Sequence, residues 1–183
     1  MTVHHRSATS WLQCLCDVAL MLASMLSLAA CSREHITDVE NNMTMRPSIT
    51  YLHLLRHTPF FTSLSDQQLR WVIDHSREWE VDTGAVLSKS GPQGPSDTDY
   101  WILLDGGWRV EHDGKSFPSG HADSGKWFST RETHGQSGSL VVTKRGYVMR
   151  IPEEEMRVML NRGFAFEAHI EQGRTYYHKI FYP

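Results

Sequence analysis

The chain has 183 residues, of which 40% are hydrophobic and 10% aromatic, so it can form one packed domain and is not wholly disordered. Its formal net charge is −3 at pH 7, and this balance excludes an excess of basic residues for binding nucleic acid or an anionic membrane surface. All three cysteines lie within the first 31 residues, which excludes a disulfide or a thiolate metal site in the rest of the chain.

Residues 18–30 form a continuous apolar run that ends at Cys31. The run is too short for a transmembrane helix, which needs about 20 apolar residues, but it has the length of a signal-peptide core. The Leu-Ala-Ala sequence before Cys31 resembles the cleavage motif of bacterial lipoproteins, in which this cysteine is lipidated. One interpretation is therefore a leader over residues 1–31 and a lipoprotein anchored to a membrane through Cys31.

A second interpretation places the start of translation near Met43, which predicts a cytoplasmic protein. The first 42 residues would then come from an upstream start codon and would not be made. Asp17, at the edge of the apolar run, favours this interpretation because a charge opposes membrane insertion. The sequence leaves both interpretations open, and residues 32–46 have the polar composition of a linker.

Two helices are expected at the start of the body. Residues 47–57 predict the first, because Pro47 suits an opening turn and apolar residues recur at helical spacing. The residues of this stripe are Ile49, Leu52 and Leu55. Ser65 and Gln68 form a capping-box pattern that predicts a second helix, ending at about His75.

The apolar pattern then changes to a period of two, which indicates β-strands. Trp79 and Val81 alternate with acidic residues, so we expect these two side chains to face the core and the carboxylates to face solvent. Further strands are expected at residues 85–88, 100–104, 108–111, 140–143 and 147–151. Turns containing glycine are expected at residues 82–84, 105–107, 112–114 and 144–146, and a loop at 91–99.

Residues 152–160 predict a closing helix, because Pro152 and three glutamates occupy its first turn and Gly163 suits the position after its end.

Residues 164–183 form an aromatic tail. Its aromatic residues are Phe164, Phe166, Tyr176, Tyr177, Phe181 and Tyr182. We expect the tail either to pack on the domain or to dock a protein partner or a second copy. This order predicts a mainly β fold, an antiparallel jelly-roll barrel with N-terminal and C-terminal helices.

Several stretches of the body match one known family in their order and spacing. They are a Pro-Phe-Phe segment within 54–69, the glycine-punctuated strands of 84–106, Gly-Lys-Trp-Phe at 125–128 and the helix at 151–160. Together they resemble the cyclic-nucleotide-binding domain family, whose members carry helices at both ends of a β jelly roll. The resemblance implies such a domain over residues 47–163.

The resemblance also implies a ligand-binding cassette after Phe128. Family members that bind cyclic nucleotides have Gly-Glu after this Phe, where the Glu holds the ribose hydroxyl, and a later Arg that holds the phosphate with backbone N–H groups. Here Ser-Thr follows Phe128, and Gly138 and Ser139 stand where that Arg is expected. Arg131 could instead supply the charge and Glu132 the ribose contact. The candidate ligand-binding residues are Gly125, Lys126, Phe128, Arg131, Glu132 and Ser139.

Residues 118–121 raise a different possibility, because their sequence Pro-Ser-Gly-His matches the central motif of the type-2 phosphatidic acid phosphatases. In those enzymes the His attacks phosphate, an earlier Lys near an Arg-Pro pair binds it, and a later His acts with an Asp. The single Arg-Pro pair, at 46–47, has Val39 where the Lys is required, and no Asp follows Asp123. We therefore expect no catalytic residue here.

The sequence thus predicts a non-enzymatic, stand-alone sensor or protein-interaction module that does not bind a cyclic nucleotide in the ordinary way. One alternative is a true cyclic nucleotide sensor that uses Arg131 and Glu132. A weaker one is a phosphatase or metal-dependent enzyme centred on His121, with His112 and Asp123 as further metal ligands, although the spacing is wrong for a metal site. No cofactor other than a cyclic nucleotide is expected. No nucleic acid is expected either, because a DNA-binding module does not fit in the 21 residues after Arg162.

Overall fold

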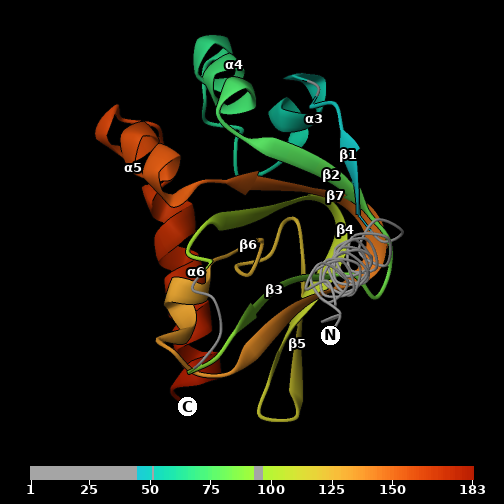
Figure 1. The fold of residues 1–183 in the computed structure, drawn as a ribbon. Coiled ribbons are helices and arrows are strands. Elements are labelled where there is room, and N and C mark those ends of the chain that lie inside the picture. Colours follow the sequence, from blue (N-terminus) through green and yellow to red (C-terminus); the bar gives the residue numbers. More distant parts are fainter. Residues whose placement is uncertain (1–44, 51, 93–96) are drawn as a thin grey trace, which may run out of the picture. The chain divides into compact units, whose positions relative to one another are not determined.

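The computed structural model describes residues 45–50, 52–92 and 97–183 (Figure 1). Residues 43–183 form one compact unit. The expectations about the leader, lipidation of Cys31 and the start of translation lie outside the described residues. Within the described residues, no helix has the length and apolar character needed to cross a membrane.

Along the part of the chain that the structure describes, two α-helices come before most of the strands and two more come after them. The helices are α3 (Leu52–His57), α4 (Asp66–Asp74), the 3₁₀ helix η1 (Thr130–Thr133), α5 (Glu153–Asn161) and α6 (Glu167–Phe181). The strands are β1 (Met45–Ser48), β2 (Arg77–Val81), β3 (Val86–Ser90), β4 (Tyr100–His112), β5 (Lys115–Gly120), β6 (Trp127–Phe128) and β7 (Gly138–Ile151).

The strands form one antiparallel sheet in the order β1-β2-β7-β4-β5, with β3 paired to β7 and β6 paired to β4. The two long central strands pair from Tyr100 opposite Ile151 to Glu111 opposite Ser139. Antiparallel pairing and the flanking helices are as expected. The described strands, however, form an open, curved sheet rather than a closed barrel (Figure 1).

Two of the predicted turns are wrong, because residues 105–107 and 144–146 lie inside the continuous strands β4 and β7. The β4–β7 register shifts at Asp105 and Gly107, so the glycines mark β-bulges that bend the strand instead of reversing it. Gly106 has φ +91°, and a Cβ on it would lie 2.7 Å from the carbonyl oxygen of Lys144. The turn at 112–114 is confirmed, since Asp113 and Gly114 both have positive φ and join β4 to β5.

The helix expected from Pro47 is also wrong. Pro47 lies in β1, opposite Trp79, and the helix begins only at Leu52. Because β1 is an end strand of the sheet, a residue without an N–H is tolerated there. Ile49 is consequently not part of a buried stripe and is 71% exposed, whereas Leu55 is fully buried as expected.

The second helix, α4, has the predicted start. The Ser65 hydroxyl accepts a hydrogen bond from the Gln68 N–H (3.3 Å), and the Gln68 side-chain oxygen accepts one from the Ser65 N–H (3.0 Å). This reciprocal arrangement satisfies two N–H groups that have no partner within the helix.

Replacement of Ser65 by alanine is expected to lower the free energy of unfolding by about 1 kcal/mol, because the N–H of Gln68 loses its acceptor. Urea denaturation followed by circular dichroism measures this loss. Ser116→Ala, which removes an exposed hydroxyl from β5, is the matched control and should leave the stability unchanged. Equal midpoints for the two variants would contradict a stabilising role for the cap.

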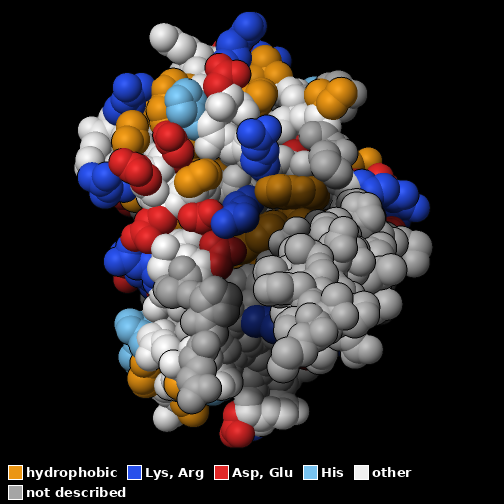
Figure 2. All heavy atoms as spheres, in the orientation of Figure 1, with side chains coloured by type: hydrophobic (Ala, Val, Ile, Leu, Met, Phe, Trp, Pro, Cys, Tyr) orange, Lys and Arg blue, Asp and Glu red, His pale blue; other side chains and the backbone are white. Residues whose placement is uncertain are grey.

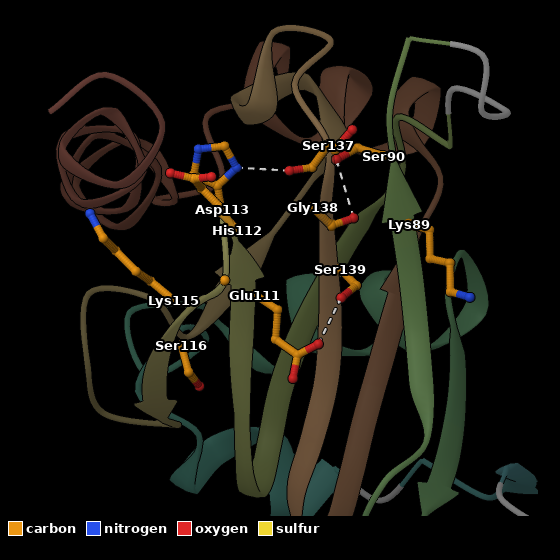
Figure 3. Close-up of a pocket in the computed structure, with 11 residues that line it drawn as sticks. Lys89, Ser90, Glu111, His112, Asp113, Lys115, Ser116, Ser137, Gly138 and Ser139 are labelled. Atoms are coloured by element: carbon orange, nitrogen blue, oxygen red, sulfur yellow. Dashed lines mark hydrogen bonds between the residues drawn. The ribbon is translucent and has the colours of Figure 1, made fainter.

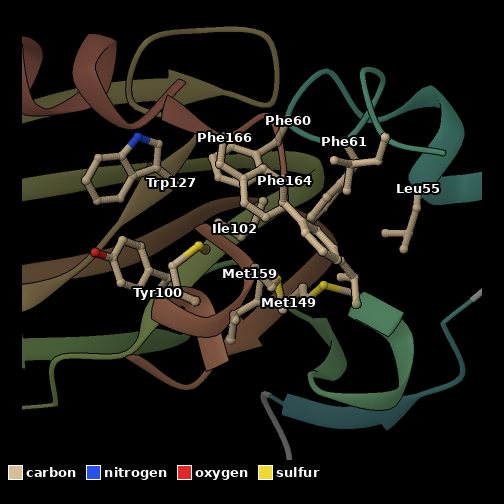
Figure 4. Packing of buried hydrophobic residues seen from close by; sticks show 14 of the residues in the cluster. Leu55, Phe60, Phe61, Tyr100, Ile102, Trp127, Met149, Met159, Phe164 and Phe166 are labelled. Atoms are coloured by element: carbon tan, nitrogen blue, oxygen red, sulfur yellow. The ribbon is translucent and has the colours of Figure 1, made fainter. Parts of the chain in front are cut away.

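The core lies on both faces of the sheet, and β4 contributes to each because successive residues point to opposite faces. Tyr100, Ile102 and Leu104 pack in a cluster with residues of α3, α4 and α5 (Figure 4). Trp101 and Leu103 pack in a second cluster, which includes residues of β3, β6 and α6.

Burial of both faces also explains an error in the predicted alternation of β2. Trp79 packs on the second cluster as expected, but Glu78 is only 4% exposed instead of facing solvent. Glu78 stands opposite Met149, which belongs to the cluster beneath the helices. An alternating pattern therefore does not mean that one face of this strand meets water.

Candidate functional site at the cassette and helix α6

The cassette segment, residues 128–139, leaves the core at Phe128 and passes through η1 before it enters β7. Ser129 donates a hydrogen bond to the carbonyl oxygen of Thr98 (2.8 Å), and Thr130 donates one to that of Asp97 (2.6 Å). These hydroxyls anchor the start of the segment to the residues that precede β4. His134 ends η1 in the left-handed conformation, with φ +48°.

Helix α6 lies beside η1 and β6 (Figure 1). Tyr177 of this helix is fully buried, and its hydroxyl donates to the carbonyl oxygens of Trp127 (2.5 Å) and Gly125 (3.3 Å). Its ring meets Phe128 edge to face, with centroids 5.4 Å apart. At the far end of the cassette segment, the Gln136 amide donates to the carbonyl oxygen of Phe181 (2.8 Å). The helix is therefore fastened to both ends of the segment.

The tail predicted at 164–183 is thus largely a helix that packs on the domain. Four of its six aromatic residues are buried, namely Phe164, Phe166, Tyr177 and Phe181. Tyr176 is half-buried, and Tyr182 is 42% exposed.

The two charged residues singled out in the cassette segment each form an ion pair with a following helix. Arg131 pairs with Glu153 at the start of α5. Glu132 lies 3.8 Å from Arg174 of α6, measured from Oε1 to Nε, and its side chain is only 12% exposed. Burial raises the pKa of Glu132, and the neighbouring Arg174 partly opposes that effect.

Arg131 and Glu132 share a cavity of about 280 Å³ with three residues that the sequence did not single out. These are His134, at the end of η1, and Arg174 and His178, one turn apart on α6. The spacing of four residues between Arg174 and His178 was the available signal, because it places both side chains on one helix face. This spacing is informative only on a helix, and the aromatic composition of residues 164–183 does not by itself predict one.

The other candidate residues lie elsewhere. Phe128 is fully buried in the core, and the carbonyl oxygen of Gly125 accepts a hydrogen bond from the Trp108 indole (2.8 Å). Lys126 is 4% exposed and donates to the carbonyl oxygen of Asp123 (3.3 Å), and burial lowers the pKa of Lys126.

Ser139 lines a separate pocket of about 480 Å³ at the tip of the β4–β5 hairpin (Figure 3). Its hydroxyl donates to Glu111 (3.2 Å), and His112 bonds through Nδ1 to the carbonyl oxygen of Ser137 (2.8 Å). Lys89 and Lys115 point away from the centre of the pocket in this view. Some polar groups of the pocket thus bind one another, and its two lysine side chains do not converge on its centre.

The Pro-Ser-Gly-His motif occupies the end of β5 and the turn that follows. Ser119 is buried, and its hydroxyl donates to that of Tyr176 (3.2 Å), while the Gly120 N–H donates to Asp123 (2.7 Å). His121 is half-buried. Across the part of the chain that the structure describes, no group of three or more His, Cys, Asp or Glu side chains is placed to hold a metal ion.

Among the described residues, the face shown in Figure 2 carries no large patch of one charge. On the face shown in Figure 2, basic and acidic side chains of the described residues alternate. Several are paired, including Arg150 with Asp97 and Asp99, and Arg145 with Glu80. This arrangement matches the near-balanced composition of the whole chain.

The open antiparallel sheet, the flanking helices and the cassette segment define the fold of the cyclic-nucleotide-binding domains. A search of solved structures finds this similarity at low sequence identity. The structure described as Sp-2Cl-cAMPS bound to PKAR CBD2 aligns with a TM-score of 0.54 and 16% identity, over 71% of this chain and 86% of that one. A second, described as cAMP bound PfPKA-R (141-441), aligns with a TM-score of 0.55 and 15% identity, over 80% of this chain and 48% of that one.

A third similar structure is the regulatory subunit of a cAMP-independent protein kinase A from Trypanosoma brucei. It aligns with a TM-score of 0.52 and 16% identity, over 72% of this chain and 50% of that one. No protein-family model and no curated protein matches the sequence. The chain therefore shares the fold of these regulatory domains, and this identity level says nothing of its ligand.

Proposed function

We propose that the chain is a non-enzymatic regulatory module, a sensor or protein-interaction domain, in which α6 and not a cyclic nucleotide occupies the cassette segment. The observation that carries this proposal is the seating of Tyr177 against Phe128, with its hydroxyl bonded to the backbone beside it. The ion pairs of Arg131 and Glu132 support it, because both charged groups needed for a nucleotide already have partners in α5 and α6.

The fold is compatible with such a role. The similar structures include one described as bound to Sp-2Cl-cAMPS, one described as bound to cAMP and a regulatory subunit of a kinase described as cAMP-independent, so this architecture serves both cases. Domains of this fold are typically regulatory and non-catalytic. By this analogy, a partner or a small ligand would act by changing how α6 contacts the cassette segment.

Calorimetric titration of the full chain with cyclic AMP and with cyclic GMP tests the proposal. We expect no saturable heat with either nucleotide, because the charged groups would first have to leave their partners and the phosphate would lack an arginine in the usual position. Circular dichroism and a cooperative thermal transition must show that the titrated protein is folded.

Micromolar binding that is lost in Arg131→Ala would overturn this proposal and establish the alternative, a cyclic nucleotide sensor with a rebuilt phosphate site. Arg157→Ala is the matched control for that variant, since Arg157 is an exposed arginine on α5 paired only with Glu154 among the described residues. Binding that survives Arg131→Ala would equally contradict the proposal, and it would place the nucleotide elsewhere.

A further inference from the structure

The cavity between η1 and α6 is lined entirely by ionisable side chains. They are Arg131, Glu132, His134, Arg174 and His178. Four of the five are cationic or become cationic when protonated, and one is a carboxylate. A cavity of about 280 Å³ in which no described lining residue has an apolar side chain suits a small, strongly charged ligand better than a planar base.

Arg174 is the group in this cavity that is most available to a ligand. Its nearest carboxylate oxygens belong to Glu132, at 3.8 Å, and Glu171, at 4.0 Å, and both distances exceed a hydrogen bond. The Tyr100 hydroxyl lies near the Arg174 guanidinium, which has five N–H donors. The Arg174 side chain is 53% exposed, so its donors can reach a molecule in the cavity.

The same geometry brings further basic groups to the cavity from both sides. His178 follows Arg174 by one turn of α6, and His134 approaches from the end of η1. Both imidazole rings lie 5.4 Å from the ring of Tyr182, measured between centroids. Arg131 contributes from η1, although Glu153 already pairs with it.

We propose that this cavity binds a small oxyanion with two negative charges, such as inorganic phosphate or the phosphate group of a monoester, which bridges the cassette segment to α6. Arg174 holds the anion as the principal donor through charge-assisted hydrogen bonds, and His134 and His178 line the same cavity with ring nitrogens that can donate to it. The inference rests on the proposed function, since it names a ligand class for the regulatory contact between the cassette segment and α6.

Glu132 makes this binding dependent on pH. The titratable groups that face it are Arg131 and His134 of η1, Glu171, Arg174 and Tyr177 of α6, and Tyr100 of β4, while His178 of α6 lines the same cavity. Burial raises the pKa of Glu132, so this carboxylate accepts a proton at a higher pH than an ordinary glutamate. Lowering the pH therefore removes the charge that repels an anion, so affinity should rise.

Sulfate is the probe for the pH series, because its charge stays constant from about pH 8 to about pH 5, where phosphate titrates. The full chain is titrated calorimetrically at fixed ionic strength, with chloride replacing sulfate in the reference. We expect saturable binding that tightens as the pH falls. Arg174→Ala should weaken it about tenfold or more, the effect of losing a charge-assisted hydrogen bond. Glu132→Gln should tighten binding at pH 8 and flatten the pH dependence.

Arg157→Ala, an exposed arginine of α5 outside the cavity, is the matched control and should leave sulfate binding unchanged. Arg174→Lys keeps the charge and should retain part of the affinity, and a thermal melt verifies that each variant is folded. Separate titrations with inorganic phosphate and phosphoserine distinguish a free anion from an ester by which of them binds more tightly.

Equal responses to sulfate and chloride, or equal affinities of Arg174→Ala and Arg157→Ala, would overturn the oxyanion site. Such a result leaves the regulatory proposal intact, because that proposal depends on the seating of α6 and is tested by cyclic nucleotide binding and by the stability of α6 variants, not by sulfate. The sulfate titration can therefore contradict the oxyanion site without contradicting the regulatory proposal.

Discussion

Tyr177→Ala is expected to lower the free energy of unfolding by about 3–5 kcal/mol, the usual cost of truncating a large buried aromatic side chain. The ring is fully buried between Trp127 and Phe128, and the hydroxyl bonds to two carbonyl oxygens. Removal leaves a cavity at the contact between α6 and the sheet, and these carbonyls lose a donor. Guanidinium denaturation with fluorescence detection measures the loss.

Tyr182→Ala is the matched control, because Tyr182 follows the same helix and is 42% exposed. Tyr177→Phe separates the two contributions, since it keeps the ring and removes the hydroxyl. We expect it to cost about 1–3 kcal/mol, because the Trp127 carbonyl oxygen loses its short hydrogen bond in a buried site, whereas the Gly125 carbonyl oxygen keeps the Trp108 indole as a donor. A loss for Tyr177→Ala no larger than that for Tyr182→Ala would mean that α6 is not seated on the cassette segment in solution.

Gly173→Ala is expected to destabilise the protein although alanine is the better helix former. In an exposed helix this change would stabilise by about 1 kcal/mol. Here a Cβ would overlap the indole of Trp127, with Cζ2 of that ring at 2.8 Å. Trp127 is fully buried and its Nε1 donates to the carbonyl oxygen of His169, so neither the ring nor the helix can move freely.

The expected loss for Gly173→Ala is about 1–3 kcal/mol, the usual cost of inserting a methyl group into a packed core. Denaturant unfolding measures it, with Gln172→Ala as the control at an exposed position of the same helix. A gain in stability for Gly173→Ala would show that α6 does not approach Trp127 this closely.

These two variants also bear on the regulatory proposal. Each weakens the docking of α6 without changing the charged residues of the η1–α6 cavity. If α6 blocks the cassette segment, a folded variant with looser docking becomes the protein in which to repeat the cyclic nucleotide titration. The oxyanion would act in the opposite sense, because a bridge between Arg174 and η1 favours the docked helix.

The elements that the sequence determined by itself depend on short-range signals. The Ser65–Gln68 capping box begins α4, the Asp113-Gly114 pair closes the β4–β5 hairpin, and Pro152 with its following glutamates begins α5. Each signal works through contacts within about four residues, so it can be interpreted from the sequence alone. The ordered motifs also identified the family whose fold the structure shows.

Only the tertiary structure decided the features that depend on distant partners. Asp-Gly-Gly at 105–107 has the composition of a turn, yet pairing with β7 keeps β4 continuous and makes those glycines a bulge. Pro47 has the character of a helix start, yet pairing with β2 holds it in an edge strand. In both cases pairing with another strand overrides a local preference worth about 1 kcal/mol or less.

The candidate site also contains residues that the sequence could select and residues that only the folded structure brings to it. Arg131 and Glu132 could be selected from the sequence because they follow Phe128 in the position of a ligand cassette. Arg174 and His178 stand more than 40 residues later, and no local signal connects them with Glu132. Their meeting depends on the packing of α6 against η1, which the burial of Tyr177 and Gly173 directs. The burial of apolar surface can bring together residues at any separation in the sequence. The cavity between η1 and α6 therefore forms only when the chain folds.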